Sequence, residues 1–276
     1  MNITENINRF KLYLYEEEKS QNTIEKYMRD IRAFFEYLGH GELTKQAVLE
    51  YKKYLSEVKA ISSANSMIAS INSYFRFLDK QELCVKYFKI QREAFCPAEK
   101  ELTKEEYKRL VSTAKKRGNE RLSLIIQTIC GTGMRVSELR YITVENLKRG
   151  EIRVNCKGKI RTILLVKKLK KMLLDYTRKN GIKKGIVFKT MGDKPVSRTS
   201  IWRDMKALCE ESGVSKEKTF PHNLRHLFAR VFYSLEKDIA KLADILGHSS
   251  INTTRIYIVT TSKEHRHKME QMRLIV

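Results

Sequence analysis

The sequence predicts a mainly α-helical protein with two domains: an N-terminal helical bundle and a larger, mostly helical α+β domain that contains a small antiparallel sheet. Three observations predict it. Apolar residues recur at helical spacing through the first 90 residues, periodicity is lost at 91–100, and the later pattern is helical apart from two β-rich runs. A chain of 276 residues can bury two cores. We expect domains at residues 1–90 and 99–276, joined by a linker at 91–98.

The first domain contains several amphipathic segments. The first helix is expected within residues 3–18, and the apolar positions of the later ones fall within 24–38, 48–55 and 67–78. Breakers at His40-Gly41-Glu42 and Ile61-Ser62-Ser63 separate these helices. Thr44 and either Ser62 or Ser63 are predicted N-caps, because their hydroxyls can accept from the first free backbone N–H groups.

The second domain begins with a helix-start signal. Leu102 supplies a hydrophobic staple, and Thr103 with Glu106 forms a T-x-x-E capping box. Further on, residues 151–155 and 161–166 are rich in β-formers and are joined by Cys156-Lys157-Gly158-Lys159-Ile160. This pattern predicts a β-hairpin that carries lysines.

The charge of the chain indicates a polyanionic partner. The formal net charge is +23, and the basic excess is concentrated after residue 98: residues 1–98 hold 15 basic and 13 acidic side chains, and residues 99–276 hold 40 and 19. An anionic membrane surface is the alternative, but the chain shows no amphipathic anchor or lipidation signal. Nucleic acid is therefore favoured.

Neither a secretion signal nor a membrane span is recognisable. The N-terminus lacks a charged-then-apolar pattern, and no apolar run approaches about 18 residues. The five cysteines are scattered and form no CxxC pair, so neither a disulfide framework nor a zinc knuckle is indicated. A cytoplasmic protein with reduced cysteines is expected.

The segment PHNLRHLFAR carries a possible phosphate grip. His222, Arg225 and His226 are spaced three and four apart, so they can share one helix face. A plain capped helix with a partly buried histidine is the structural alternative. Zinc binding through His222 and His226 is a second alternative, but Asn223 stands where the HExxH motif requires its glutamate.

The segment LGHSSINTTRIY adds a histidine and a possible nucleophile. His248 follows a glycine and precedes two serines, which is typical of a turn between helices, and a solvated turn histidine is the alternative. Tyr257 lies between two isoleucines and can instead be a packing residue. A tyrosine hydroxyl that attacks a phosphate held by arginine and histidine would transfer a phosphoryl group.

The segment GTGMRVSELR contributes a further arginine. Arg135 follows a predicted Gly131-x-Gly133 turn at the start of a helix, and Glu138 can orient it. The GxG is not a dinucleotide-binding motif, because no strand precedes it and a third glycine is missing.

Taken in order, these motifs resemble the tyrosine recombinase or phage integrase family over nearly the whole chain. The residues that carry the resemblance are Arg135 with Glu138, Lys157, His222 with Arg225, His248, and Tyr257. The resemblance implies a SAM-like core-binding domain before a catalytic domain. The resemblance is to Xer-like members of the family, and an enzyme without an added arm-binding domain is expected.

The resemblance also implies a role for each residue. Arg135 and Arg225 match the arginines that clamp the scissile phosphate, Tyr257 matches the nucleophile, and Lys157 matches the general acid of the hairpin. His222 and His248 match histidines that contact phosphate oxygens or assist proton movement, with Glu138 and His226 in support. Lys159 competes with Lys157 for the role of general acid. Leu227 and Arg230 depart from the commonest family pattern without removing a catalytic group.

The implied activity is site-specific DNA recombination. Strands would be cut and rejoined through a 3′-phosphotyrosine intermediate without ATP, metal or another cofactor. Double-stranded recombination sites and a homotetramer on DNA are the implied partners, accessory proteins are left open, and the tail at 262–276 would dock on a neighbouring subunit. A strand-swivelling topoisomerase and a non-catalytic DNA-binding regulator are the alternatives. Predicted DNA contacts, each of which can instead belong to a solvated face, are Lys159, Arg161, Lys167, Lys168, Lys170 and Lys171.

Overall fold

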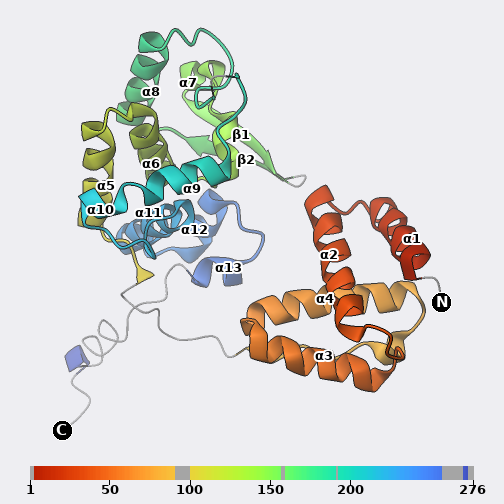
Figure 1. The fold of residues 1–276 in the computed structure, drawn as a ribbon. Helices are drawn as coiled ribbons and strands as arrows, with labels where there is room; N and C mark the ends of the chain where they lie inside the picture. Colours follow the sequence, from red (N-terminus) through yellow and green to blue (C-terminus); the bar gives the residue numbers. More distant parts are fainter. Residues whose placement is uncertain (1–2, 91–99, 157–158, 191, 257–269, 273–276) are drawn as a thin grey trace. The chain divides into compact units, whose positions relative to one another are not determined.

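The computed structural model describes residues 3–90, 100–156, 159–190, 192–256 and 270–272 (Figure 1). The chain divides into two compact units, residues 1–92 and 93–276. The predicted linker at 91–98 lies outside the described residues, as does most of the tail at 262–276. The predicted fold class is confirmed: described residues are mostly helical, and the two named strands form one antiparallel sheet.

Unit 1 is a bundle of four α-helices with a final 3₁₀ turn. Its elements are α1 (Ile3–Glu16), α2 (Gln21–Leu38), α3 (Lys45–Val58), α4 (Ile61–Phe77) and η1 (Gln81–Leu83). Fully buried apolar side chains such as Phe10, Ile31 and Phe75 form its core. Thr44 caps α3 as predicted, because its side chain accepts from the N–H of Ala47.

The predicted start of α4 was wrong. Residues 61–63, expected as a breaker with a serine cap, form the first turn of the helix. Ala60 is the N-cap residue and offers no side-chain hydrogen bond. Ile61 is partly exposed and the serines keep helical geometry, so the hydrogen-bonded turn prevails over the weak local preference of two serines.

Unit 2 surrounds a second core with helices and one hairpin. Its elements are α5 (Lys104–Lys116), α6 (Glu120–Thr132), η3 (Val136–Tyr141), α7 (Val144–Arg149), β1 (Glu151–Cys156), β2 (Lys159–Leu164), α8 (Lys167–Lys179), α9 (Arg198–Lys206), α10 (Cys209–Ser212), α11 (Pro221–Glu236), α12 (Ile239–Leu246) and α13 (Ile251–Arg255). The capping box of Thr103 and Glu106 is present at the start of α5. Buried α6 packs against α5 and α11 in the centre of the unit.

The hairpin presents one face to this core. β1 and β2 pair antiparallel, with Val154 opposite Arg161 and Ile152 opposite Ile163. Val154 is fully buried, whereas Ile160 of β2 is 72% exposed. Because side chains alternate along a strand, Arg161 and Ile163 share the inward face.

Two groups of elements lie at opposite ends of unit 2. In Figure 1, α8 lies at the upper end of this unit and α12 with α13 at the lower end.

Among the described residues, no helix is both long and apolar enough to cross a bilayer.

Candidate active site

Arg225 forms the buried centre of the candidate site. It projects from the second turn of α11 and is only 2% exposed. One terminal nitrogen, Nη1, donates to the carbonyl of Gly133 at 2.6 Å. The other, Nη2, donates to the carbonyl of Leu246 and to Nε2 of His248, each at 2.8 Å. A buried guanidinium needs such acceptors to offset the loss of hydration.

A glycine at the end of α6 makes this arrangement possible. Gly133 adopts φ of +65° as the C-cap residue, in the left-handed region that favours glycine. A Cβ at this position would lie 2.4 Å from the ring of Phe228. The predicted turn at Gly131-x-Gly133 was wrong in one respect, because Gly131 is still within α6. The helix ends one residue later, at Thr132, and Gly133 leads the chain on to Arg135.

Arg135 is the more accessible arginine of the site. It is the N-cap residue of η3, and its side chain is 36% exposed. Its Nη1 donates to Oε1 of Glu138 at 3.1 Å, and its backbone N–H donates to Oε2 of the same carboxylate at 2.7 Å. Glu138 therefore fixes both the backbone and the side chain of Arg135, which is the orienting role predicted from the sequence.

Glu138 is 1% exposed and remains charged. Burial alone would raise the pKa of its carboxyl group. The backbone N–H of Arg135 and the positive charges of Arg161 and Arg135 outweigh that effect, and the pKa is lowered below its ordinary value. The site thus contains a fixed negative charge between two arginines.

Three arginines donate to three consecutive carbonyl groups at the C-terminal end of α12. The pairs are Arg161 with Ile245, Arg225 with Leu246, and Arg135 with Gly247. The last carbonyls of a helix have no partner within the helix and carry the negative end of its dipole. This end of α12 therefore holds several guanidinium groups close together despite their mutual repulsion.

His248 lies in the turn between α12 and α13, as predicted. Its Nε2 accepts from Arg225, so its Nδ1 carries the proton and donates to Oγ1 of Thr254 at 2.9 Å. Partial burial, followed by the charges of Arg225, Arg135 and Arg161, lowers the pKa of His248 to about 4. His248 is therefore neutral at pH 7.

His222 and His226 lie on adjacent turns of α11. Their rings meet edge to face with centroids 4.8 Å apart. Burial and then the charge of His222 lower the pKa of His226 to about 4. The pKa of His222 is lowered by desolvation first and then by the charge of Arg225. Within the described part of the chain, no group of three or more metal-binding side chains forms around them or elsewhere.

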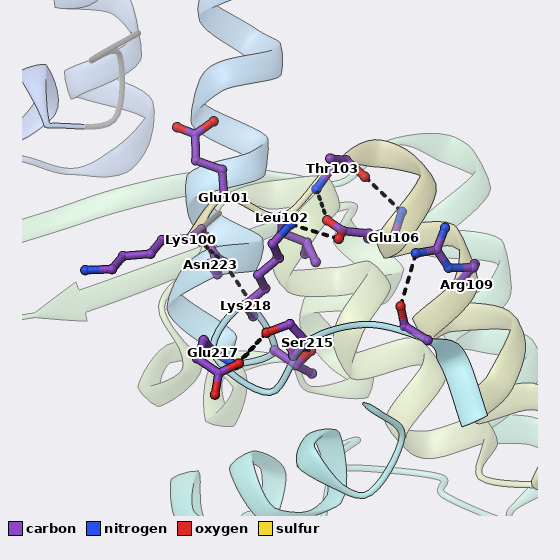
Figure 2. Close-up of polar contacts among 12 residues, drawn as sticks. Lys100, Glu101, Leu102, Thr103, Glu106, Arg109, Ser215, Glu217, Lys218 and Asn223 are labelled. Atoms are coloured by element: carbon purple, nitrogen blue, oxygen red, sulfur yellow. Dashed lines mark hydrogen bonds and ion pairs between the residues drawn. The ribbon is translucent and has the colours of Figure 1, made fainter. Parts of the chain in front are cut away.

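The first turn of α11 is attached to the segment that opens unit 2. Figure 2 shows Asn223 beside Lys100 and Lys218: its side-chain amide donates to the carbonyl of Lys100 at 3.0 Å and to that of Lys218 at 2.8 Å. Arg230, one of the departures from the family pattern, contacts Glu101 and donates to the carbonyl of Leu102 at 2.5 Å. These contacts fix the helix that carries His222 and Arg225.

The remaining predicted residues are placed differently. Lys157 and Tyr257 lie outside the described residues, and Lys159 begins β2. Arg161 does not form the surface contact expected of a DNA-binding residue, since its side chain is 12% exposed and bound to Glu138.

Helix α8, which carries four of the predicted lysines, lies at the upper end of unit 2 in Figure 1, whereas α12 lies at the lower end. Lys167, Lys168 and Lys171 are exposed, whereas Lys170 donates to the carbonyl of Lys148 at 2.8 Å. Among the described residues, no hydrogen bond or ion pair joins these lysines to Arg135, Arg161 or Arg225.

Two residues of the site were missed by sequence reasoning. Thr254 is fully buried, and its hydroxyl accepts from Nδ1 of His248, which holds the imidazole ring in place. The sequence shows a threonine six residues after His248. The two side chains can meet only because the chain turns between α12 and α13, and the sequence pattern did not predict that geometry. Asn223 is the second. In the sequence it marks only the missing glutamate of an HExxH motif, but its short polar side chain also binds backbone carbonyls next to the first turn of α11.

Comparisons with known proteins agree with this architecture. Residues 100–264 match the profile of the phage integrase family, and residues 7–82 match the phage integrase N-terminal SAM-like domain. Tyrosine recombinase XerA of Pyrococcus furiosus is 30% identical over 281 residues, covering 99% of this chain and 95% of XerA. A crystal structure of XerA recombinase superposes with a TM-score of 0.56 at 26% identity, covering 99% of both chains. A lambda integrase tetramer bound to a Holliday junction has a TM-score of 0.73 at 20% identity, covering 92% of this chain and 76% of that one.

Proposed function

This chain belongs to the phage integrase family of tyrosine recombinases, and on that premise we propose that it cuts and rejoins DNA at specific sites through a 3′-phosphotyrosine intermediate. One observation carries the proposal: Arg135, Arg225 and His248 converge at the C-terminal end of α12. In this proposal Tyr257 is the nucleophile.

The two arginines are suited to a phosphodiester in its transition state. Attack on phosphorus increases the negative charge on the non-bridging oxygens, and guanidinium groups bind such oxygens through paired N–H donors. Arg135 and Arg225 donate to neighbouring carbonyls of one helix end, so their spacing is set before DNA binds. Such fixed positive charge does not depend on a metal ion or ATP.

The proposed step exchanges one phosphoester for another. The Tyr257 oxygen forms a bond to phosphorus as the bond from phosphorus to the 5′ oxygen breaks. The phenol proton passes to water or to His222, which is neutral because its pKa is lowered. Lys157 donates a proton to the departing 5′ oxygen, and the 5′-OH of a second strand can reverse the step.

Tyr257 is well placed in the sequence for this role. It follows α13 by two residues, and Thr254 of that helix bonds to His248. The candidate nucleophile is thus attached to the helix that contacts the phosphate-binding group.

The partner we propose is double-stranded DNA carrying a recombination site, bound by four copies of the chain. The lambda integrase assembly, a tetramer on a Holliday junction, has the same fold as this chain and supports that arrangement. The basic excess after residue 98, including the exposed lysines of α8, supports contacts to the DNA backbone. Docking of the tail at 262–276 on a neighbouring subunit belongs to the same proposal.

Covalent capture tests the proposal directly. A site is first selected by binding from a library of duplexes that carry inverted repeats, and the selected duplex is then nicked next to the cleavage position. We expect a covalent protein-DNA adduct that survives denaturation, forms equally in EDTA and is absent with Tyr257→Phe. Tyr87→Phe, which removes an exposed hydroxyl of unit 1, is the matched control and should leave the adduct unchanged.

Each alternative gives a different result. Binding without an adduct would favour a DNA-binding regulator and overturn the proposed chemistry. Relaxation of supercoiled DNA without exchange between two sites would favour a topoisomerase. A strict requirement for a divalent metal would contradict the role given to the arginine pair.

A further inference from the structure

Arg161 occupies an inward-facing position of the hairpin that would ordinarily hold an apolar residue. It lies two residues before Ile163, on the same face of β2, and it pairs with buried Val154 of β1. Its neighbour Ile160 faces outward and is 72% exposed. An arginine on the inward face must find strong acceptors to offset its desolvation.

Two acceptors from distant parts of the sequence meet this arginine. Its Nη2 donates to Oε2 of Glu138 at 2.5 Å, and its Nη1 donates to the carbonyl of Ile245. Its remaining donor, Nε, is buried and has no hydrogen-bond partner among the described residues. The side chain thus joins β2 to η3 and to the last turn of α12.

Packing against Gly247 restricts the side chain further. A Cβ on Gly247 would lie 2.5 Å from Cδ of Arg161. Gly247 also adopts φ of +64°, which glycine tolerates best. The aliphatic stem of Arg161 therefore fills the space over the turn that leads to His248.

Arg161 differs from the two arginines of the proposed phosphate clamp. Arg135 also binds Glu138, but its side chain is 36% exposed against 12% for Arg161. Arg225 joins His248 to the helix end, whereas Arg161 contacts no candidate catalytic group directly within the described residues. Its contacts are those of a connector and not of a phosphate ligand.

We propose that Arg161 is a positioning residue: it fixes β2 to the arginine cluster and thereby limits where the adjoining Lys157 can meet the scissile phosphate. Residues 157 and 158 connect β1 to β2, and Arg161 is the third residue of β2. The inference rests on the proposed function, because it assigns a task to the lysine that protonates the departing oxygen. General acids act only within hydrogen-bond reach, so a small displacement of the hairpin reduces proton transfer.

A change of leaving group tests this role. The selected duplex is prepared with either oxygen or sulfur at the bridging 5′ position of the scissile phosphate. A thiolate, whose conjugate acid has a pKa near 8.5, leaves without protonation, whereas an alkoxide does not. Wild type, Arg161→Ala, Arg161→Lys and Lys157→Ala are compared in single-turnover cleavage at saturating protein.

We expect Arg161→Ala to slow cleavage of the oxygen substrate by about tenfold or more. A misplaced general acid loses part of the rate acceleration that proton transfer provides. On the sulfur substrate its rate should return to within about threefold of wild type, as should that of Lys157→Ala. Arg161→Lys keeps the charge but provides only a point donor, so it should show a smaller loss with the same recovery.

Arg153→Ala is the matched control. It removes an arginine from the other strand of the same hairpin, where the side chain is 76% exposed. We expect unchanged cleavage of both substrates. Thermal unfolding of each free protein verifies folding, and if Arg161→Ala does not fold, Arg161→Lys decides the outcome.

The possible failures are distinguishable. A slow Arg161 variant that stays equally slow on the sulfur substrate would overturn the hairpin role and indicate damage to the phosphate clamp. Full activity on the oxygen substrate would also overturn it. If wild type forms no adduct with either substrate, the proposed function itself is wrong, whatever the Arg161 variants do. If wild type cleaves but sulfur does not restore Lys157→Ala, the assignment of Lys157 fails and this inference with it.

Discussion

Among the residues that the structure describes, each unit of the chain buries one carboxylate side chain. In unit 1, Asp30 is 4% exposed and accepts from Ser70 at 2.8 Å while Lys26 contacts the same oxygen. Lys26 also donates to the carbonyl of Ser66 at 3.0 Å. This network joins α2 to α4, and all of its contacts lie within the helical bundle of unit 1.

In unit 2, Glu138 is 1% exposed and accepts from two arginines. One of them, Arg135, keeps a side chain that is 36% exposed, and both arginines also donate to the end of α12. Both carboxylates are buried, but Asp30 joins two helices of the bundle, whereas Glu138 holds one partly exposed and one largely buried arginine at the candidate site. Burial of an acid therefore does not identify a functional site. What sets Glu138 apart is that both of its arginines also donate to carbonyl groups just before His248.

The largest effect should come from the buried arginine of unit 2. Arg225→Lys keeps the positive charge but cannot reproduce the contacts to Gly133, Leu246 and His248. We expect cleavage of the nicked duplex to slow by about a hundredfold or more, in line with the loss of other preorganised donors.

Single-turnover rates at saturating protein measure this effect separately from DNA binding. Asp30→Asn, a change in the other network, should leave the rate for bound substrate within about twofold. An Arg225→Lys rate within tenfold of wild type, or an equal loss in Asp30→Asn, would remove the distinction between the networks.

Local sequence signals predicted much of the fold. Two helix caps were predicted correctly, the capping box of Thr103 with Glu106 and the cap at Thr44. Each depends only on residues three apart within one turn. The two misplaced boundaries, at Ser62 and at Gly131, lie where a helix continues through residues with weak helical preference. At both positions the backbone hydrogen bonds of the helix prevail. Helix formation is cooperative over several turns, so the preferences of single residues do not place the boundary.

The site was predictable in its residue types but not in its connections. The spacing of motifs predicted that Arg135 is oriented by Glu138, and their contact is local. The carbonyls of Ile245, Leu246 and Gly247 have no sequence signature, because every residue has a carbonyl group. For the same reason, the inward position of Arg161 followed only from the observed register of the hairpin.

A smaller effect, on stability alone, is expected from the network of unit 1. Asp30→Asn removes the charge that Lys26 contacts but keeps an acceptor for Ser70. Because Lys26 is 32% exposed and can turn toward water, we expect a loss of about 1–3 kcal/mol in the stability of unit 1.

Hydrogen exchange of peptides from α2 and α4 measures that loss within unit 1. Glu25→Gln, which changes an exposed carboxylate of the same helix, is the matched control and should stay within about 0.5 kcal/mol of wild type. A stability change confined to unit 2, or equal changes in both variants, would contradict a structural role for Asp30.

The smallest effect should be a dependence of stability on pH that is specific to unit 2. Unit 1 contains one histidine, the exposed His40, whereas unit 2 contains His226 and His248, whose pKa values are lowered to about 4. An unfolded chain binds protons at the ordinary histidine pKa of about 6.5, so between these values it holds more protons than the folded one. Stability of unit 2 should therefore rise with pH across this window and fall as the pH drops from 7 to 5.5.

Trp202, the only tryptophan of the chain, lies in α9 and reports unfolding of unit 2. We expect its urea midpoint to be lower at pH 5.5 than at pH 7, and His226→Gln to reduce that difference because one titrating group is removed. A midpoint that rises on acidification would mean that the histidines gain protons on folding. That result would be incompatible with neutral histidines beside Arg225 and would require a different proton acceptor for Tyr257.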